Sequence, residues 1–561
     1  MLQPQHPEQV AVTSSSRAMD RTRTNTRSDE RTLSGHTVRE VIAEVAQRAP
    51  TRNYLLAPES GSALSYADLE RRAREIAGHL DALGLRMGEV VSFMLGNGPG
   101  TAELILGSMY GGFICAPLNA ASGLSQLTYV LDHSQTDIVF VSADHEEKLR
   151  QALASIKREV RIIVTDVDTG PEWPSATSTN SSLPNVESSD DAMLMYTSGT
   201  TGKPKGVLLT HENMLNGGRN VAGAHALSPD DRGLCVLPLC HINAQAVSLL
   251  GTLLSGSTVV LPHHFSVKHF WDWITAHECT WFSVVPTMIA YLLHDGDMPD
   301  SSAREALEKV RFGRSASAPL PPALHEQFES RFGIPIIETM GITEAAAQIL
   351  ANPMPPAARK IGSPGLPYGN DVIIANASGE LGPNEDGEIL VRGPNVMRGY
   401  LRDPEGTAAA IDTNGWLHTG DLGRKDDEGF VFVTGRLKEL IIKGGENISP
   451  REIDDALFSH PAVVEAGTIG IPDDLLGEEV VACVVIRDDM PCTEQNLIEH
   501  CTARTGAFKA PRAIYFMSEL PKGPTGKILR HELAAIIQRD LAPTLSEPRV
   551  GTSTIDPPKT A

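Results

Sequence analysis

The chain has 561 residues, which is too long for one ordinary core, so three or four domain-sized units are expected. Its net charge of −22 argues against nucleic acid or an anionic membrane surface as a partner. The seven cysteines include no Cys-x-x-Cys motif, which is typical of reduced thiols and predicts a cytoplasmic protein. No apolar run reaches the roughly 18 residues that a membrane-spanning helix needs, so no span is predicted.

The two ends of the chain differ in composition from its middle. Residues 1–34 are polar and lack the apolar core of a secretory signal, which predicts a disordered leader. An organellar transit peptide is the alternative, although Asp20, Asp29 and Glu30 interrupt its basic pattern. Residues 541–561 contain four prolines and are predicted to form a disordered tail.

Strand and helix patterns alternate through the first part of the chain. Apolar residues at helical spacing predict a helix over 69–80, and the run at 89–94 predicts a strand. The same alternation continues with a buried helix at 102–114, a strand at 137–141, a helix at 146–156 and a strand at 160–164. This order predicts an α/β core of layered sheets and helices.

A loop rich in glycine, hydroxyl groups and lysine follows the apolar strand that ends near Thr197. Glycine lets backbone N–H groups turn toward an anion, and Ser, Thr and Lys add donors and charge, so the loop is predicted to bind the phosphates of a nucleotide. It is not a Walker A loop, because two residues separate its glycines and Pro204 follows Lys203. The residues predicted to contact the phosphates are Thr197, Ser198, Gly199, Thr200, Thr201, Gly202 and Lys203. The alternative interpretation of this segment is a solvated polar turn with no ligand.

A second, smaller domain of about one hundred residues is predicted to start after Arg436. Ser449-Pro450-Arg451-Glu452 has the pattern of a capping box that opens a helix. Strands are expected at 463–469 and 480–486, and a final helix around 528–539. These elements predict a small α+β domain.

Together with later motifs, the phosphate loop resembles the signature of the adenylate-forming superfamily, the AMP-forming acyl-CoA synthetases and their relatives. The similar motifs follow in the family's order: Met340–Glu344, Gly387–Ile389, Trp416–Asp421, Gly435–Glu439, Gly477–Glu478 and Pro521–Lys527. They span roughly residues 36 to 540. Two features depart from the pattern: Met340 replaces an aromatic residue, and Ser315–Pro319 replaces a glycine-rich loop.

The resemblance implies both a fold and a reaction. The fold is a large N-terminal α/β adenylation domain, residues 35–436, joined to a small mobile C-terminal α+β domain, residues 437–540. The reaction activates a carboxylic acid with ATP, releases pyrophosphate, and passes the acyl group from AMP to coenzyme A. Rotation of the small domain about a hinge at Lys438 separates the two steps.

Roles for individual residues follow from the same resemblance. Lys527 reaches the α-phosphate and the attacking carboxylate, Thr343 contacts the phosphate, and Glu344 holds Mg²⁺. Asp421 accepts hydrogen bonds from the ribose hydroxyls, with Arg436 assisting. Further ATP contacts are implied for Ala316, Ser317, Ala318, Met340 and Gly341. Coenzyme A is expected along Lys443, Gly444 and Gly445, although the two glycines could form a simple turn.

The acid is the least specified substrate. The segment around His241 resembles the family's gate between the acid and coenzyme A, and it lacks the Asp that holds the amine of amino-acid substrates. Residues 314–319 and 343–353 resemble the oxalate-CoA ligase branch, but Ala347 stands where oxalate enzymes usually carry His. His241, Asn243, Gln245, Arg314 and Gln348 could form a polar pocket for a small, doubly anionic acid that is sulfoacetate-, malonate- or oxalate-like.

Several alternatives stay open at the level of sequence. The same polar residues could support an aliphatic tunnel in a short- or medium-chain fatty acyl-CoA synthetase. The acyl group could be loaded onto a carrier protein, or the chain could be an inactive nucleotide-binding regulator. The oligomeric state is also open, a homodimer included.

Overall fold

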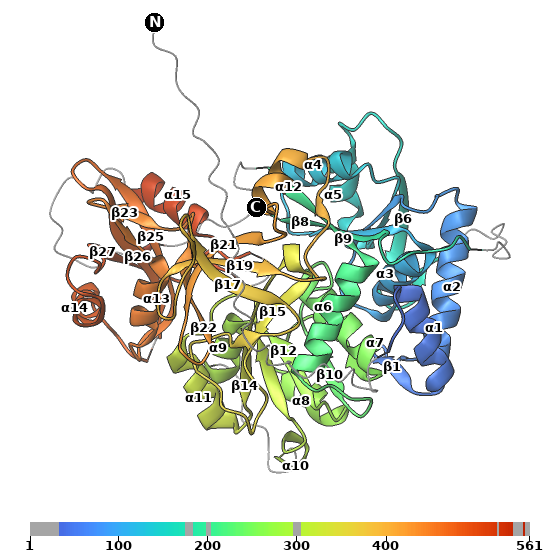
Figure 1. Ribbon diagram of the computed structural model, residues 1–561, viewed down its shortest axis with the longest axis horizontal. Helices are drawn as coiled ribbons and strands as arrows, with labels where there is room; N and C mark the ends of the chain where they lie inside the picture. The colour runs from blue at the N-terminus through green and yellow to red at the C-terminus, as the bar shows by residue number, and fades with distance from the viewer. Residues whose placement is uncertain are drawn as a thin grey trace, which may run out of the picture.

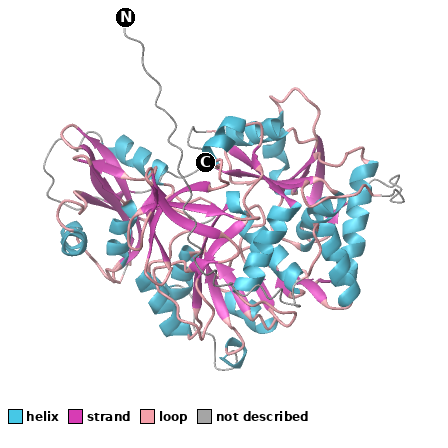
Figure 2. Ribbon diagram, viewed as in Figure 1, coloured by secondary structure: helices cyan, strands magenta, loops and turns pink. Residues whose placement is uncertain are grey.

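The computed structural model describes residues 33–173, 183–197, 203–294, 304–487, 489–523, 527–541 and 554–555. Phosphate-loop residues 198–202 and nearly all of the predicted leader and tail lie outside these ranges. Figures 1 and 2 show a large body of layered sheets and helices, with a smaller body formed by the C-terminal part of the chain. Within the described ranges, no helix combines the length and hydrophobicity needed to cross a membrane.

The first sheet of the large body is mostly parallel. Both faces of β3 are covered, so all of its residues are buried, as is typical of central parallel strands. The strand order is β20-β9-β8-β4-β3-β5-β6-β7. The strands are β3 (Val90–Met94), β4 (Ile114–Pro117), β5 (Ile138–Val141), β6 (Arg161–Asp166), β7 (Gly170–Pro171), β8 (Asp191–Thr197), β9 (Lys205–Thr210) and β20 (Gly399–Tyr400).

A second sheet has the order β16-β15-β14-β13-β12-β10-β11-β1-β2 and is parallel from β1 to β14. Its strands are β1 (Asn53–Leu56), β2 (Ala63–Ser65), β10 (Arg232–Cys235), β11 (Thr258–Val260), β12 (Trp281–Val284), β13 (Phe312–Ser315), β14 (Ile336–Ile342), β15 (Ala347–Ala351) and β16 (Leu366–Pro367). The C-terminal ends of β13 and β14 carry the residues that were predicted to contact ATP. Ligand sites at this edge are common in parallel sheets.

Helices fill the space between these two sheets. α6 contacts β8 and β9 of the first sheet and β15 of the second, and one apolar cluster extends through the layer. The layer contains α1 (Val38–Arg48), α2 (Tyr66–Ala82), α3 (Pro99–Gly111), α6 (His211–Ala224), a π-helix (Asn243–Leu250) and α7 (Gly251–Ser255). The other helices of the large body are α4 (Leu124–Ser134), α5 (Ala143–Leu153), α8 (Phe270–Ala276), α9 (Pro286–His294), α10 (Arg304–Leu307), α11 (Pro322–Phe332) and α12 (Pro404–Ala410).

An antiparallel sheet, which the sequence patterns did not predict, joins the large body to the small one. Its order is β18-β17-β19-β21-β22, with β17 (Asp371–Asn376), β18 (Gly379–Glu380), β19 (Gly387–Arg392), β21 (Leu417–Lys425) and β22 (Val431–Arg436). Asp421 and Arg436 are directly paired across β21 and β22. Residues from two motifs of the sequence therefore meet on adjacent strands.

The small body is a sheet with helices. It contains β23 (Ile441–Lys443), β24 (Glu446–Ile448), β25 (Val463–Asp473), β26 (Gly477–Ile486), β27 (Ala513–Met517) and β28 (Thr554–Ile555), with α13 (Pro450–Phe458), α14 (Glu494–Thr505) and α15 (Arg530–Leu541). Two apolar clusters form its core. The predicted fold class, a large α/β domain with a small α+β domain, is confirmed.

One local prediction about the small domain is wrong. Helix α13 begins at Pro450 as expected, but Ser449 makes no side-chain cap to it. The Ser449 hydroxyl instead donates to the Thr434 carbonyl at 2.6 Å, and Glu452 pairs with Lys509. The Ser449 hydroxyl therefore forms a tertiary hydrogen bond with β22 in place of the local hydrogen bond of a capping box.

Candidate functional site

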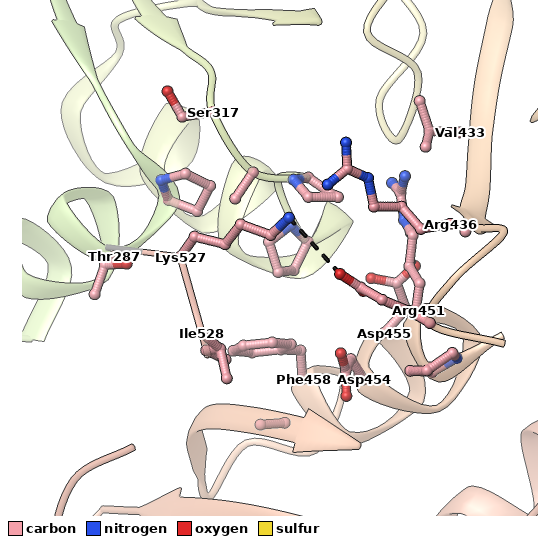
Figure 3. A pocket seen from close by; sticks show the side chains of 18 of the residues that line it. Thr287, Ser317, Val433, Arg436, Arg451, Asp454, Asp455, Phe458, Lys527 and Ile528 are labelled. Atoms are coloured by element: carbon pink, nitrogen blue, oxygen red, sulfur yellow. Dashed lines mark ion pairs between the residues drawn. The ribbon is translucent and has the colours of Figure 1, made fainter. Parts of the chain in front are cut away.

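A cavity of about 250 Å³ lies between the large and small bodies. Both bodies contribute to it, because Asp421 and Arg436 come from the antiparallel sheet and Lys527 comes from the small domain. In Figure 3, Lys527 extends across the cavity toward Arg436, and Ser317 lies on the wall formed by the large domain. The cavity brings together six predicted ATP residues: Ser317, Ala318, Met340, Gly341, Asp421 and Arg436.

One residue that lines this cavity, Gly341, lies near the end of β14, where β14 pairs closely with β15. A Cβ atom on Gly341 would lie 1.6 Å from the Ala347 carbonyl oxygen, so no larger residue fits there without moving the backbone. The strand register also shifts between Met340 and Gly341. The glycine in this motif is therefore required by the close approach of two strands.

Ser317 occupies backbone space that usually favours glycine. Its φ is +72°, and its hydroxyl accepts a hydrogen bond from the Asn243 amide at 3.1 Å. Left-handed backbone at a non-glycine residue is uncommon and is found most often at functional sites. The serine thus keeps the bend expected of a glycine-rich loop and adds a polar contact.

The charged side chains of the nucleotide cavity face opposite charges. Arg436 Nε lies 2.5 Å from Asp421 Oδ1, and Lys527 Nζ lies 3.8 Å from Glu439 Oε1 (Figure 3, dashed line). Burial and the nearby Arg436 lower the pKa of Lys527, while Glu439 and Asp421 oppose this shift. Lys527 therefore lies beside Asp421 and Arg436, the two residues predicted to contact the ribose.

Glu344 lies in the large domain beside two hydroxyl groups. Its Oε1 accepts hydrogen bonds from Tyr400 at 3.2 Å and from Thr197 at 3.4 Å. Burial raises the pKa of Tyr400, and Glu344 adds to that shift. This group of oxygen atoms fits Mg²⁺, which is usually held by one or two carboxylates together with substrate phosphates. Within the described ranges no cluster of three His, Cys, Asp or Glu side chains could hold a metal without such help.

A second cavity, of about 270 Å³, adjoins the first. The two share Ser317, Gly341 and Ile342 as a common wall. The second cavity is lined by His241, Asn243, Arg314 and Thr343, together with Ala316 and Ala347. His241, Asn243 and Arg314, which were predicted to surround the acid, thus meet Thr343, which was predicted to contact the phosphate of ATP.

Arg314 is the charged residue of this second cavity. It is only 2% exposed, and its guanidinium donates to Asn243 Oδ1 at 3.1 Å and to Ser283 Oγ at 3.4 Å. Its Nε has no hydrogen-bond partner. In the part of the chain that the structure describes, no carboxylate pairs with it. Burial lowers the pKa of Arg314 to about 9, so most of the side chain stays charged near neutral pH.

His241 lies at the side of the same cavity. Burial lowers its pKa to about 4, so its imidazole is neutral at physiological pH. Its Nε2 is buried without a hydrogen-bond partner. Depending on its tautomer, the Nε2 atom of a neutral His241 ring can accept a hydrogen bond from a ligand in the cavity or donate one to it.

Other predicted site residues lie elsewhere. The Gln245 amide donates to the Leu239 carbonyl and the Gln348 amide to the Asn220 carbonyl, and neither residue lines either of the two cavities described above. Lys438 lies in an exposed turn after β22. Lys203 lies over the ring of Tyr129 at 5.8 Å, and the neighbouring phosphate-loop residues 198–202 are outside the described ranges.

The predicted coenzyme A segment also lies apart from both cavities. Lys443 is buried and pairs with Glu479 at 2.5 Å. Gly444 and Gly445 have φ values of +59° and +86° and form the turn between β23 and β24. Figure 1 shows β23 on the outer part of the small domain. In this orientation of the domains, the contacts described for the three residues are all within the small domain.

Sequence reasoning missed several residues of the site. Thr287 of α9 and Glu439 line the nucleotide cavity, and Tyr400 donates a hydrogen bond to Glu344, the candidate Mg²⁺ ligand. Glu439 is the last residue of the recognised motif Gly435–Glu439, but it was given no role there. Thr287 and Tyr400 belong to no motif, and only the fold brings them to the site.

Comparisons with known proteins agree with this geometry. The model of the AMP-binding enzyme family matches residues 42–401, and that of the AMP-binding enzyme C-terminal domain matches residues 452–527. A sulfoacetate–CoA ligase of Cupriavidus necator is 45% identical over 89% of this chain and 97% of its own length. An oxalate–CoA ligase of Arabidopsis thaliana is 34% identical over 90% and 98%.

A solved structure gives the same result for the fold. ATP-bound MatB from Rhodopseudomonas palustris superimposes with a TM-score of 0.80 at 27% identity, covering 90% of this chain and 99% of MatB. Family, relatives and structure agree with the predicted reaction class and with its use of ATP, Mg²⁺ and coenzyme A. The chain belongs to the AMP-binding enzyme family and is an AMP-forming carboxylate–CoA ligase.

Proposed function

We propose that the acid substrate is a short carboxylate with a second anionic group, of the sulfoacetate type. The observation that carries this proposal is Arg314, a buried cation in the wall of the second cavity whose protein partners are both neutral. The carboxylate to be activated would lie near the shared wall. The second anion would then pair with the guanidinium.

Electrostatics favours a charged substrate tail over an aliphatic one. Taking a guanidinium out of water without an opposite charge costs several kcal/mol, on the order of the penalty for any buried ion. A sulfonate or second carboxylate within hydrogen-bonding distance would offset that cost. A fatty acyl chain would leave Arg314 unpaired, so the fatty acyl-CoA synthetase alternative is disfavoured.

Among doubly anionic acids, two observations favour sulfoacetate over oxalate. The relative that is 45% identical to this chain carries the name sulfoacetate–CoA ligase, whereas the oxalate–CoA ligase is 34% identical. Ala347 also lines the cavity at the position where oxalate enzymes usually carry His. A methyl group there leaves space for an acid longer than oxalate.

For the adenylation step we propose that Lys527 compensates the charge of the carboxylate as it approaches the α-phosphate. Thr343, on the wall of the acid cavity, would donate to the phosphate, and Asp421 would accept from the ribose. Glu344 would hold Mg²⁺, which neutralises phosphate charge when bound. Positioning and charge compensation of this kind supply most of the catalysis in phosphoryl-transfer enzymes.

We also propose that the protein acts in the cytoplasm. All seven cysteines are free thiols, and Cys115, Cys235, Cys279, Cys483 and Cys501 are buried. Burial raises the pKa of each of these five thiols, which keeps them unreactive. A reducing compartment is where unpaired thiols are most common.

The test is pyrophosphate release with a panel of acids at equal concentration. The panel contains sulfoacetate, malonate, oxalate, acetate and butyrate, each with ATP, Mg²⁺ and coenzyme A. We expect sulfoacetate to exceed butyrate in kcat/KM by about 10²-fold, since the site would otherwise bury an unpaired charge. A preference for butyrate or longer chains would overturn the proposal, and a preference for malonate would retain the doubly anionic class but reject the sulfonate.

A further inference from the structure

Lys522 lies in the hairpin that carries Lys527. Lys522 and Ile528 form an antiparallel bridge, and the Gly523 amide donates to the Lys527 carbonyl at 2.8 Å. The Leu529 amide also donates to the Pro521 carbonyl at 2.9 Å. The position of Lys522 and the position of Lys527 are therefore linked through a short stretch of paired backbone.

The Lys522 side chain points away from this hairpin toward the large domain. Its Nζ donates to the Tyr291 hydroxyl at 3.1 Å and lies 5.5 Å from the centre of the Tyr291 ring. Tyr291 belongs to α9, whose residues Thr287 and Ala290 line the nucleotide cavity. Figure 3 shows Thr287 on the side of the cavity from which Lys527 extends. The contact therefore joins the two domains next to the site of adenylation.

A third residue holds Lys522 in this direction. Glu465, on β25 of the small domain, pairs with Lys522 at 2.5 Å, and the two side chains are 18% and 9% exposed. A charge-assisted hydrogen bond shielded from water in this way is stronger than one at the surface. Glu465 moves with the small domain and Tyr291 with the large one, so only the Tyr291 contact is sensitive to how the domains are oriented.

We propose that Tyr291 and Lys522 form an interdomain latch that holds Lys527 in place for adenylation and must break before thioester formation. The inference rests on the two-step function proposed above and on rotation of the small domain about its hinge. We assign both as positioning residues: Tyr291 does not line the nucleotide cavity, and Lys522 lines it but its ammonium group is bonded to Tyr291 and Glu465. The superposition with an ATP-bound enzyme over both domains supports the view that this is the adenylation orientation.

A latch has opposite consequences for the two half-reactions. Loss of the contact lowers the population of the adenylation orientation, so acyl-AMP forms more slowly. The other orientation no longer has to break the contact, so acyl-AMP supplied from outside reacts with coenzyme A at an equal or higher rate. A residue that serves only folding would slow both half-reactions together.

The experiment compares Tyr291→Phe and Lys522→Met with the wild-type full chain. Adenylation is followed as pyrophosphate release without coenzyme A, using the best acid of the panel. Thioester formation is followed from the preformed adenylate of that acid. We expect a loss of about five- to tenfold in adenylation from the removal of one charge-assisted hydrogen bond, with no loss in thioester formation. Lys522→Arg keeps the charge and the donor and should restore most of the rate.

Lys509→Met is the matched control. Lys509 also pairs with a carboxylate of the small domain, Glu452 at 2.8 Å, but this pair does not reach the large domain. The control should keep both rates. Equal slowing of both half-reactions by Tyr291→Phe, or no change in adenylation, would overturn the latch.

A second measurement does not depend on the identity of the acid. With ATP alone bound, Tyr291→Phe should raise amide hydrogen exchange in residues 286–294 and 513–523 relative to wild type. Unchanged exchange in both segments would reject the latch even if every acid of the panel failed. Absence of pyrophosphate release by the wild type, with raised exchange in the variant, would reject the proposed acids and keep the latch.

Discussion

In the nucleotide cavity, each charged residue to which we assign a role faces an opposite charge of the protein, as Asp421 faces Arg436 and Lys527 faces Glu439. In the neighbouring acid cavity, the partners that Arg314 has among the described residues, Asn243 and Ser283, are both neutral. In the nucleotide cavity the charges are already balanced by the protein before a ligand binds, which suits ATP, the substrate common to the whole family. The acid cavity leaves a charge for the substrate to balance, which is where specificity for one acid can arise.

The largest effect is expected at the nucleotide cavity, where Lys527→Ala removes a charge that matters in the transition state. Adenylation should fall by about 10²–10³-fold, the usual loss for one preorganised group. Thioester formation from preformed acyl-AMP serves as the internal control and should persist. Equal loss in both half-reactions would show that Lys527 supports the structure rather than the first step.

Arg314→Gln tests the acid cavity by removing its unpaired charge while keeping a hydrogen-bond donor. We expect kcat/KM for sulfoacetate to fall by about 10–10²-fold, because the second anion loses its partner, with little change for acetate. Arg311→Gln is the matched control, since Arg311 lies immediately before β13 and already pairs with Asp231 at 2.7 Å. It should lower stability without changing the order of preferred acids.

Asn243→Asp makes the acid cavity resemble the nucleotide cavity by giving Arg314 a carboxylate partner. The new carboxylate would compete with the second anion of the substrate, so preference for sulfoacetate over butyrate should fall about tenfold. Rates with acetate report whether the cavity is still intact. A rise in sulfoacetate preference would contradict the assignment of Arg314.

The smallest effect concerns a buried polar residue that serves the scaffold. Burial lowers the pKa of His225 from 6.5 to about 3, so the unfolded chain takes up a proton at a higher pH than the folded one. Its contribution to stability is present above pH 6.5 and is lost as the pH falls toward 3. His225→Gln should therefore weaken the fall of the unfolding free energy between pH 6.5 and 5.5 by about 1 kcal/mol. Thermal unfolding against pH measures this slope, and an unchanged slope would reject a neutral buried His225.

Periodicity and motif order were enough to predict the α/β core and much of the site. The predicted helix over 69–80 is α2, and the predicted strand over 89–94 is β3. Met340, Gly341, Asp421, Arg436 and Lys527 line one cavity, as the order of the family's motifs implied, although they come from β14, from the antiparallel sheet and from the small domain. The helix and strand patterns and the short motifs can be recognised in the sequence without knowledge of tertiary contacts.

The remaining features depend on contacts between distant parts of the chain. The amides of Gln245 and Gln348 turn to backbone carbonyls instead of the acid cavity, because buried backbone acceptors must be satisfied. The π-helix that begins at Asn243 is what brings its amide between Arg314 and Ser317. No spacing in the sequence distinguishes an amide used by the scaffold from one used by the substrate.

The wall shared by the two cavities limits how this enzyme can change its substrate. Gly341 has no room for a side chain, and Ser317 contacts both compartments, so enlarging the acid space there would disturb ATP as well. Variants selected for a different acid should therefore carry their substitutions at Arg314, Asn243 or Ala347, and their KM for ATP should stay close to that of the parent.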